Sequence, residues 1–405
     1  MESHHATTVH GANGTTKKNI YNEDDPSTSS EGRPLVSSWL PIIENSLYSL
    51  LRWTGSYPAE VQESHLTFVR EAVVPCLKPP AAADKLHYIG THHHGPFEAS
   101  VAFASHKKAK VRFAVQPLIN ISPGGDDPMG EKEMRKKIEN LASACNADRT
   151  WLNPYIDSVF LTSQEEKTLL DKHASGGGAG SPLPRQICFV GFDLESEVDK
   201  NGKAAITFKV YLFPQLKALA TGQKLEDITE SVVERLAEGD KEMLAAWKLL
   251  RKFLESDAGD YPYIYFLAID CLAPHKKPRF KVYVHTRFNS LATARNVFTL
   301  GGLLPPASAD FVPQVWPLLL DMEDIPLDKM DGMEKPLNDP ESKYCGLCFA
   351  FALVPGQAVP QVKVYVPMWQ YARDEPGIVE RYQRILETQG KMGDYDVGSA
   401  FKCAL

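Results

Sequence analysis

The 405-residue sequence lacks several features that would place it in a well-defined class of protein. No apolar run approaches the ~20 residues that a membrane-spanning helix needs. The N-terminal MESHHATTVHGANGTTKK has no apolar core of the kind that secretory signals carry, so we expect a cytoplasmic protein with no membrane partner. The seven cysteines are odd in number and scattered, which fits a reducing compartment better than a disulfide framework.

An excess of positive charge is also missing. The chain has 44 basic and 51 acidic residues and a formal net charge of −7, so nucleic acid is not an expected partner. The histidines of THHHGPF cannot all face one ion on a strand and lack zinc spacing, so no metal site is expected. The Gly-rich ASGGGAGSP lacks the Lys-Ser/Thr of a phosphate-binding loop and is interpreted as a linker. CGLC, at 345–348, is interpreted as a pair of buried thiols.

The pattern of apolar residues predicts one folded domain, 38–405, after a tail at 1–37 that is expected to be disordered. Helical spacing appears over 42–53 and 60–74. Four pairs of strand-like segments follow, each joined by a short connection with polar, Gly or Pro residues, as in hairpins. The pairs are KLHYIG and PFEASVAFA with KVRFAVQPL, QICFVGFDL with AITFKVYLFP, YIYFLAIDCL with RFKVYVHT, and GLCFAFALV with QVKVYVPM.

Helical patterns separate the strand pairs, at 131–145, 237–256, 289–300 and 376–390. Asn289 or Ser290 is a suitable N-cap for the third of these, and Gly301 and Gly302 would end it. Antiparallel hairpins that alternate with helices can close into a ring with the helices outside. The expected fold class is therefore α+β, an antiparallel β-barrel of repeated αββα units.

One strand pattern occurs three times in the sequence, as FKVYLFP, FKVYVHT and VKVYVPM. Side chains alternate across a strand, so each lysine shares a face with the tyrosine two residues later. If helices cover the apolar face, the polar face lines an internal cavity, and a ring of buried cations is costly unless an anion neutralises it. Tyrosine rings stabilise a nearby cation by roughly 0.5–2 kcal/mol. The pattern therefore indicates a site that separates charge, as cleavage of an allylic diphosphate does.

These motifs together resemble the fungal dimethylallyltryptophan synthase family of aromatic prenyltransferases. The similar segments, between Trp39 and Glu387, are SHLTFVREAVVPCL, GPFEAS, VRFAVQP, FDL with FKVYLFPQLKALATG, IDCL with RFKVYVHT and LATARNVFTLGG, and VKVYVPM. The resemblance implies a ten-stranded barrel that transfers a prenyl group, usually dimethylallyl, to an aromatic acceptor without an essential metal or other cofactor. Its partners would be small-molecule substrates, with a homodimer as an open alternative to a monomer.

The resemblance also implies roles for individual residues. It assigns the diphosphate contacts to Arg112, Lys209, Arg279, Lys281 and Lys363, and the shield around the allyl cation to Tyr211, Tyr283 and Tyr365. Glu98 would accept a hydrogen bond from the acceptor, which raises the nucleophilicity of its ring. Glu195 stands where tryptophan-using members carry a lysine that assists deprotonation.

Other departures from the family concern the acceptor and the C-terminus. Phe213 replaces a tyrosine near the acceptor, and YPYIYFLAID has no arginine to hold an amino-acid carboxylate. We therefore expect a neutral indole derivative or a polycyclic phenol rather than free tryptophan. Only one strand is expected after residue 389, so the last repeat is expected to be incomplete. Two alternatives stay open: a barrel that binds a phosphorylated metabolite without turnover, and a nucleotide-binding protein.

Overall fold

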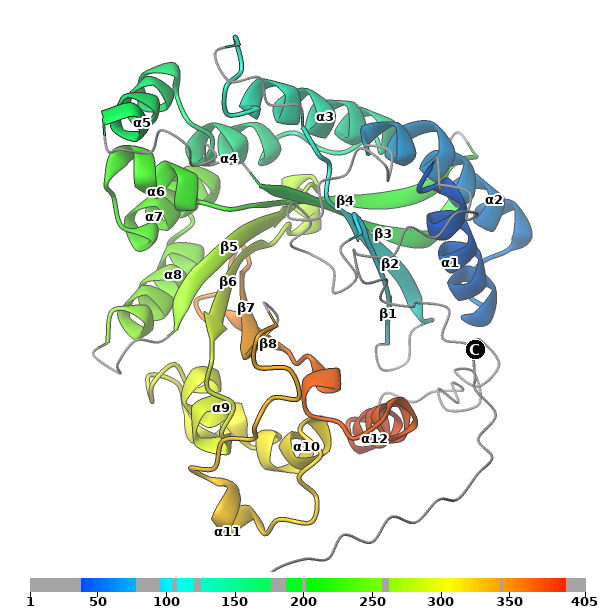
Figure 1. The fold of residues 1–405 in the computed structure, drawn as a ribbon, viewed down its shortest axis with the longest axis vertical. Coiled ribbons are helices and arrows are strands. Elements are labelled where there is room, and N and C mark those ends of the chain that lie inside the picture. The colour runs from blue at the N-terminus through cyan, green and yellow to red at the C-terminus, as the bar shows by residue number, and fades with distance from the viewer. Residues whose placement is uncertain are drawn as a thin grey trace, which may run out of the picture.

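The computed structural model describes residues 38–77, 95–103, 108–119, 125–175, 187–198, 202–256, 262–342 and 345–390. Its helices alternate with pairs of strands along the chain (Figure 1). The helices are α1 Leu40–Trp53, α2 Ala59–Phe68, α3 Glu131–Ala144, α4 Leu152–Val159, α5 Ser163–Ser175, α6 Gln215–Thr221, α7 Leu225–Ala237, α8 Lys241–Leu254, α9 Leu291–Phe298, α10 Val312–Leu319, α11 Leu327–Met330 and α12 Glu375–Thr388.

The strands form one curved antiparallel sheet in which every strand pairs with its neighbours in sequence. They are β1 Phe97–Ala102, β2 Lys110–Val115, β3 Cys188–Val198, β4 Ala204–Leu212, β5 Tyr263–Asp270, β6 Phe280–Thr286, β7 Leu347–Leu353 and β8 Gln361–Tyr365. The order β1 to β8 confirms the predicted class, an antiparallel sheet of αββα repeats with the helices outside (Figure 1). Among the described residues there are eight strands, not ten, and β1 is not paired with β8, so the sheet is curled rather than closed.

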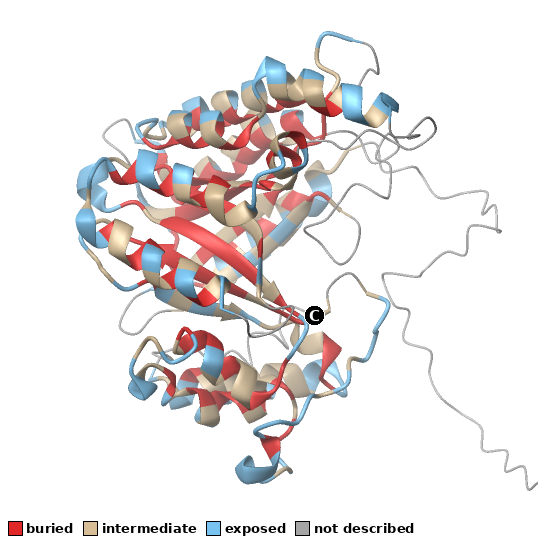
Figure 2. Cartoon of the chain, turned by 90° about the vertical axis from the view of Figure 1, so that its left-hand side faces the viewer, coloured by how far each residue is buried: buried red, intermediate tan, exposed pale blue. Residues whose placement is uncertain are grey.

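The hydrophobic core lies between the outer face of the sheet and the helices (Figure 2). On β4, for example, Phe208, Val210 and Leu212 are fully buried in this core. The residues between them point to the concave face, which we call the lumen face. The alternation follows from the period of two along a strand, and it confirms that the Lys-x-Tyr pattern faces inward on this strand.

Most predicted helix boundaries agree with the structure. The Ser290 side chain accepts a hydrogen bond from the Thr293 amide and caps α9, and Gly301 and Gly302 follow its end with positive φ angles. The pattern at 237–256 corresponds to α8, which begins at Lys241 with Asp240 as its cap. Helices α4, α5, α6, α7, α10 and α11 were not predicted.

Several predictions fall outside the described residues. They concern the tail at 1–37, the KLHYIG strand, the three adjacent histidines, most of the Gly-rich segment and the strand after residue 390. The two cysteines of CGLC are only half-buried, which corrects the prediction of buried thiols, and Cys348 borders the lumen-face cluster of apolar residues. Within the described helices, no segment is long and apolar enough to cross a bilayer.

Candidate active site

The lumen face carries the basic residues of the repeated strand pattern together with two aspartates. Lys209 and Lys281 are 5 % and 8 % exposed, so both are buried as predicted. Asp193 on β3 and Asp270 at the end of β5 are buried beside them. We call this set the charged layer; it consists of Arg112, Asp193, Lys209, Asp270, Arg279, Lys281 and Lys363.

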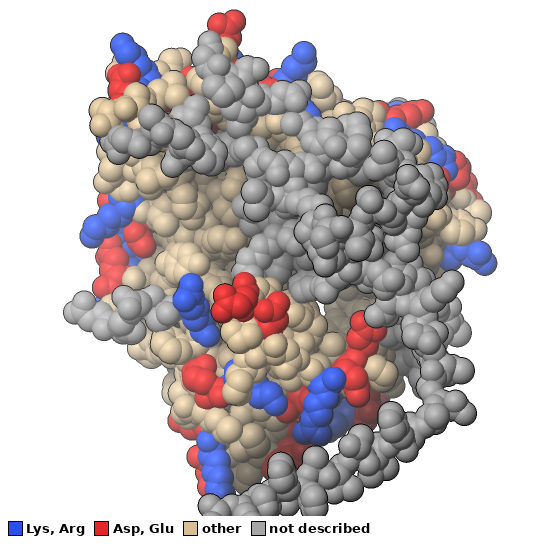
Figure 3. All heavy atoms as spheres, in the orientation of Figure 1, with Lys and Arg blue, Asp and Glu red and all other residues tan. Residues whose placement is uncertain are grey.

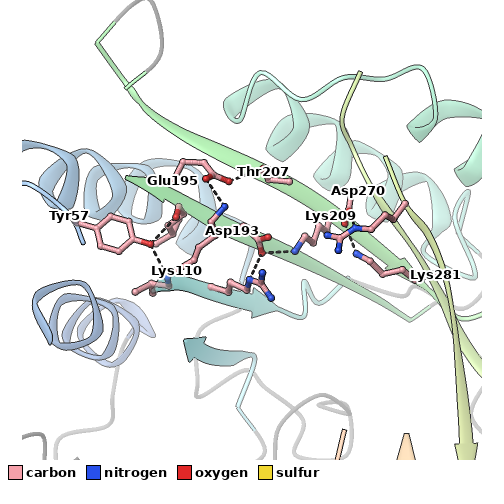
Figure 4. Close-up of polar contacts among 12 residues, drawn as sticks. Tyr57, Lys110, Asp193, Glu195, Thr207, Lys209, Asp270 and Lys281 are labelled. Atoms are coloured by element: carbon pink, nitrogen blue, oxygen red, sulfur yellow. Dashed lines mark hydrogen bonds and ion pairs between the residues drawn. The ribbon is translucent and has the colours of Figure 1, made fainter. Parts of the chain in front are cut away.

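Each aspartate holds two of the cations (Figure 4). The Asp193 carboxylate accepts a hydrogen bond from Lys209 Nζ at 2.5 Å and lies 3.2 Å from Arg112 Nε. The Asp270 carboxylate accepts from Lys281 Nζ at 2.5 Å and from Arg279 Nε at 2.6 Å. The strand register explains one of these pairs directly, because Arg112 lies opposite Asp193. Lys209 lies opposite Asp270, although its ion pair is with Asp193.

The cations outnumber the carboxylates in the charged layer. Five basic side chains face two aspartates, which leaves a formal surplus of three positive charges. Arg112 Nε makes no hydrogen bond of good geometry with any described residue. Lys363, on the edge strand β8, is accessible to solvent and forms no ion pair within the described part of the chain. Desolvation by the surrounding protein, together with Arg112 and Arg279, lowers its pKa. The layer therefore has the capacity to bind a polyanion.

The pKa values in the charged layer show how strongly its members interact. Burial lowers the pKa of Lys281 to about 8, although Asp270 acts in the opposite direction. Burial alone would raise the pKa of Asp270, but Lys281, Lys209 and Arg279 outweigh it and lower that pKa to about 2. Burial also lowers the pKa of Lys209. An added anion would raise the lysine pKa values again, since opposite charge favours the protonated form.

A second layer of aromatic side chains lies next to the charged layer, one step further along the strands. The ring centroids of Tyr211 and Tyr283 are 5.9 Å apart, and those of Tyr283 and Tyr365 are 5.8 Å apart. Phe266 stacks on Tyr283 with centroids 4.1 Å apart. Burial raises the pKa of all three tyrosines, so they remain neutral phenols. The structure thus brings together the three predicted shield residues.

Small residues make room for these rings. Ala268 and Ala350 are buried in the same cluster as Tyr283, and Gly191 lies directly under Tyr211. A Cβ atom at Gly191 would be 3.0 Å from Tyr211 Cε2 and 3.3 Å from its hydroxyl oxygen. The absence of a side chain at Gly191 therefore determines where the Tyr211 ring lies.

Glu98 lies on β1 opposite Ala114, which places it on the lumen face two positions from Arg112 on β2. Its side chain is solvent-accessible, yet the surrounding protein raises its pKa by desolvation. Its charge contributes to the raised pKa of Tyr365 on β8, although the first cause there is burial. Glu98 therefore faces the tyrosine layer from the opposite edge of the sheet.

Glu195 lies at a different place from Glu98. Its carboxylate accepts hydrogen bonds from Lys110 Nζ at 2.6 Å and from the Thr207 hydroxyl at 3.2 Å (Figure 4). It follows Asp193 on the same face of β3 and so extends the charged layer outward. The structure does not bring the two predicted catalytic glutamates into contact.

Sequence reasoning missed Asp193, Asp270 and Phe266. The expectation that the polar face carries cations and tyrosines alone holds for the repeated strands, but the strands between them supply the carboxylates. The segments FVGFDL and YFLAID could have indicated Asp193 and Asp270. An acidic residue at the end of an apolar strand must have a partner when it is buried. Among the described residues no group of three His, Cys, Asp or Glu side chains is arranged to hold a metal ion.

Comparison with known proteins supports a common origin. A family model described as tryptophan dimethylallyltransferase matches residues 37–398. The chain is 31 % identical to an indole prenyltransferase of Emericella nidulans over 359 residues, which cover 85 % of this chain and 81 % of the relative. It is 30 % identical to an indole diterpene prenyltransferase of Tolypocladium album over 389 residues, which cover 92 % and 86 % of the two chains.

Solved structures show the same fold. A crystal structure of AnaPT from Neosartorya fischeri matches with a TM-score of 0.67 and 23 % identity, over 91 % of this chain and 83 % of that one. A complex of NotF with brevianamide F and DMSPP matches with a TM-score of 0.67 and 19 % identity, over 89 % and 82 % of the two chains. The resemblance and the enzyme class, an aromatic prenyltransferase, are confirmed. The chain belongs to the tryptophan dimethylallyltransferase family.

Proposed function

We propose that the chain transfers a dimethylallyl group from dimethylallyl diphosphate to an aromatic acceptor in fungal secondary metabolism. One observation carries this proposal: a lumen-face layer with surplus positive charge, built around the buried Lys209 and Lys281, lies directly beside a layer of neutral tyrosine rings. The first layer can hold a diphosphate, and the second can stabilise the allyl cation that remains when the diphosphate leaves. The proposed setting is the cytoplasm, and the proposed reaction uses no metal or other cofactor.

The proposed reaction begins with cleavage of the C–O bond, whose electron pair leaves with the diphosphate. Arg112, Lys209, Arg279, Lys281 and Lys363 bind that leaving group and compensate its growing charge. Tyr211, Tyr283 and Tyr365 surround the allyl cation and exclude water, which would otherwise add to it and form an alcohol. The π electrons of the acceptor ring then form the new bond, and the ring passes through a cationic intermediate that loses a proton.

Two carboxylates have proposed roles in the second half of the reaction. Glu98 accepts a hydrogen bond from an N–H or O–H of the acceptor and stabilises the positive charge that develops on the ring. Glu195 is the proposed site of proton uptake, and its contact with Lys110 keeps it oriented. Both assignments extend the family resemblance to positions that the geometry makes accessible from the lumen face.

The proposed acceptor is a neutral indole derivative or a polycyclic phenol. Beyond the tyrosine layer, Phe213 contacts Phe189, Tyr265 and Phe266 at centroid distances of 5.3–5.7 Å. Strand β5, over Tyr263–Asp270, contains no basic residue that could bind a carboxylate. A flat apolar ring system fits this aromatic wall, whereas the carboxylate of an amino acid has no counter-ion on this strand.

An acceptor screen tests the proposal. Purified protein is incubated with dimethylallyl diphosphate and a panel of indoles and phenols, and products are identified by mass spectrometry. The expected result is prenylation of a neutral acceptor by the wild type and by Lys276→Gln, which changes an exposed lysine, with strong loss in Lys281→Gln. Folded wild-type protein that prenylates no acceptor would contradict the proposal.

The alternative is a barrel that binds a phosphorylated metabolite without turnover. The exposed edge strand β8, with Tyr365 49 % exposed, is the observation that favours it, because a shield open to water quenches the cation. Calorimetry separates the possibilities. Pyrophosphate binding without any product supports the alternative, and displacement of pyrophosphate by ATP but not by prenyl diphosphates indicates a nucleotide-binding protein.

A further inference from the structure

Two buried tyrosines outside the lumen face make the same unusual contact with the sheet. Tyr57, in the turn before α2, donates its hydroxyl proton to the Leu194 carbonyl at 2.8 Å and accepts a hydrogen bond from the Val111 amide at 2.8 Å. The phenol oxygen therefore lies between β2 and β3 and bonds to the backbone of both (Figure 4). Tyr57 is 5 % exposed.

Tyr155 on α4 repeats this contact between β4 and β5. Its hydroxyl donates to the Leu267 carbonyl at 2.7 Å and accepts from the Leu212 amide at 3.2 Å. Its side chain is fully buried. Both tyrosines thus lie where one hairpin pairs with the next, at β2–β3 and at β4–β5, and we call each of these boundaries a seam. Both side chains come from the outer helical layer.

At each seam the phenol oxygen bonds to one backbone amide and one backbone carbonyl at the end of the ladder. The β2–β3 register ends at Arg112 opposite Asp193, so the next pair would be Val111 with Leu194. The β4–β5 register ends at Leu212 opposite Leu267. In an antiparallel ladder these backbone groups would bond directly, with strands about 4.8 Å apart. At the β2–β3 seam the phenol oxygen joins Val111 and Leu194, which no register pair joins, whereas at the β4–β5 seam it bonds to the last register pair, Leu212 with Leu267.

The residues next to each phenol belong to the candidate site. Val111 and Leu194 precede and follow Arg112 and Asp193, whose ion pair is the loosest in the charged layer at 3.2 Å. Leu212 follows Tyr211, and the Leu267 carbonyl follows Phe266, whose ring centroid lies 6.1 Å from that of Tyr211. Tyr57 thus supports the charged layer, and Tyr155 supports the aromatic layer.

We propose that Tyr57 and Tyr155 are positioning residues, each of which fixes the spacing of two strands at a hairpin seam through the two backbone hydrogen bonds of its hydroxyl. Tyr57 keeps the contact between Arg112 and Asp193 long, at 3.2 Å, and Arg112 therefore stays available for the diphosphate. Tyr155 sets the spacing of Tyr211 and Phe266 around the allyl cation. This inference rests on the proposed function, but its first part concerns anion binding alone and does not need turnover.

Removal of either hydroxyl should let the two strands shift at that seam. In Tyr57→Phe we expect this shift to shorten the contact between Arg112 and Asp193, and the Kd for inorganic pyrophosphate to rise about 5- to 10-fold, the size of one ordinary hydrogen bond. In Tyr155→Phe we expect that Kd to stay within about twofold, while the fraction of dimethylallyl diphosphate converted to alcohol rises.

Tyr371→Phe is the matched control, because Tyr371 is 1 % exposed and packs beside Glu334 rather than in a strand seam. All three variants are compared with the wild type by calorimetry with pyrophosphate, by product analysis and by thermal melting. Melting temperature alone reports a structural role, and we expect it to fall in the two seam variants, whose hydroxyls each make two backbone hydrogen bonds. The contrast between pyrophosphate binding and alcohol formation is expected only in the two seam variants.

Two results would overturn the inference. One is an unchanged pyrophosphate Kd in folded Tyr57→Phe, and the other is an unchanged alcohol fraction in Tyr155→Phe. If Tyr57→Phe does not fold, the Tyr155→Phe product ratio decides alone. If the wild type turns nothing over, the proposed function fails, whereas the pyrophosphate comparison still decides the role of Tyr57.

Discussion

At the scale of single residues, Glu98 is proposed to act in the prenyl-transfer step and not in diphosphate binding. It faces the tyrosine layer and, among the described residues, forms no ion pair with the cations that would hold a diphosphate. We expect Glu98→Gln to lower kcat by roughly 10²-fold and to leave the pyrophosphate Kd unchanged. Steady-state kinetics and calorimetry check this. A weaker pyrophosphate affinity in Glu98→Gln would contradict the proposal and assign Glu98 a role in diphosphate binding.

Lys281 predicts a pH dependence. Its pKa of about 8 means that it carries a full charge below pH 8 and loses that charge as the pH rises through this value. Pyrophosphate affinity should therefore fall above pH 8 more steeply than the ionisation of pyrophosphate itself explains. In Lys281→Arg the side chain stays charged, so its profile should be flatter in the same titration; identical profiles would exclude Lys281 as the titrating group.

Gly191 tests the placement of the tyrosine shield. In Gly191→Ala the new Cβ would press on the Tyr211 ring at 3.0 Å, and overpacking of this kind costs about 1–3 kcal/mol. We expect a lower melting temperature and a larger fraction of alcohol product. Gly332→Ala is the control, because a Cβ there has no neighbour within 4 Å. An equal alcohol fraction in both variants would show that Tyr211 does not exclude water.

At the scale of secondary-structure elements, helix α2 holds the irregular end of β3. The β3–β4 register shifts between Leu194 and Val198, which leaves backbone carbonyls without ladder partners. His65 Nε2 contacts the Glu195 carbonyl at 2.9 Å, and since a carbonyl only accepts, Nε2 must carry the proton. Its Nδ1 is buried without a partner in the described residues, and burial lowers the pKa of His65.

This arrangement makes the protein sensitive to acid. The unfolded chain binds a proton at His65 as the pH falls below about 6.5, whereas the folded chain resists it, so stability is full above that pH and declines below it. Chemical denaturation between pH 7.5 and 5 should show the decline. His65→Gln keeps a donor for the Glu195 carbonyl and should reduce the slope; an unchanged slope would assign the effect to His285, whose pKa is also lowered.

The elements also show how far sequence reasoning reaches. Strand-like apolar segments joined by hairpin connections predicted all eight described strands, and period-two alternation around Lys209, Lys281 and Lys363 predicted which face of β4, β6 and β8 turns inward. Helices α4 to α7 were missed because their apolar positions pack on other helices and on strands distant in sequence. The Asp193–Lys209 pair was missed because it depends on the register between β3 and β4, which neither strand sequence determines alone.

At the scale of the whole molecule, basic residues inside the sheet differ from those outside. On the face in Figure 3, Lys and Arg side chains are interspersed with Asp and Glu, and the net charge is −7. The positive surplus is therefore internal. Because the charged layer is partly neutralised by Asp193 and Asp270, its stability without a ligand depends on those carboxylates.

Asp270→Asn tests that dependence. Loss of one partner from a buried pair costs about 3–5 kcal/mol, and Lys281 and Arg279 would both lose theirs. We expect a strongly reduced melting temperature, partly restored by pyrophosphate, which stabilises by about 2.7 kcal/mol at 100-fold Kd. Asp331→Asn, at an exposed ion pair with Arg295, should melt nearly like the wild type. A variant that pyrophosphate fails to rescue would contradict an anion site here.

The carboxylates of the charged layer have one more consequence. An incoming phosphate compound must compete with Asp193 and Asp270 for Lys209 and Lys281, so weakly charged metabolites gain little from entering. We therefore expect inorganic monophosphate to bind the resting enzyme more weakly than pyrophosphate does. A ligand thus needs enough negative charge to displace the two aspartates from the lysines. This requirement selects for diphosphates before the prenyl chain or the aromatic ring is recognised.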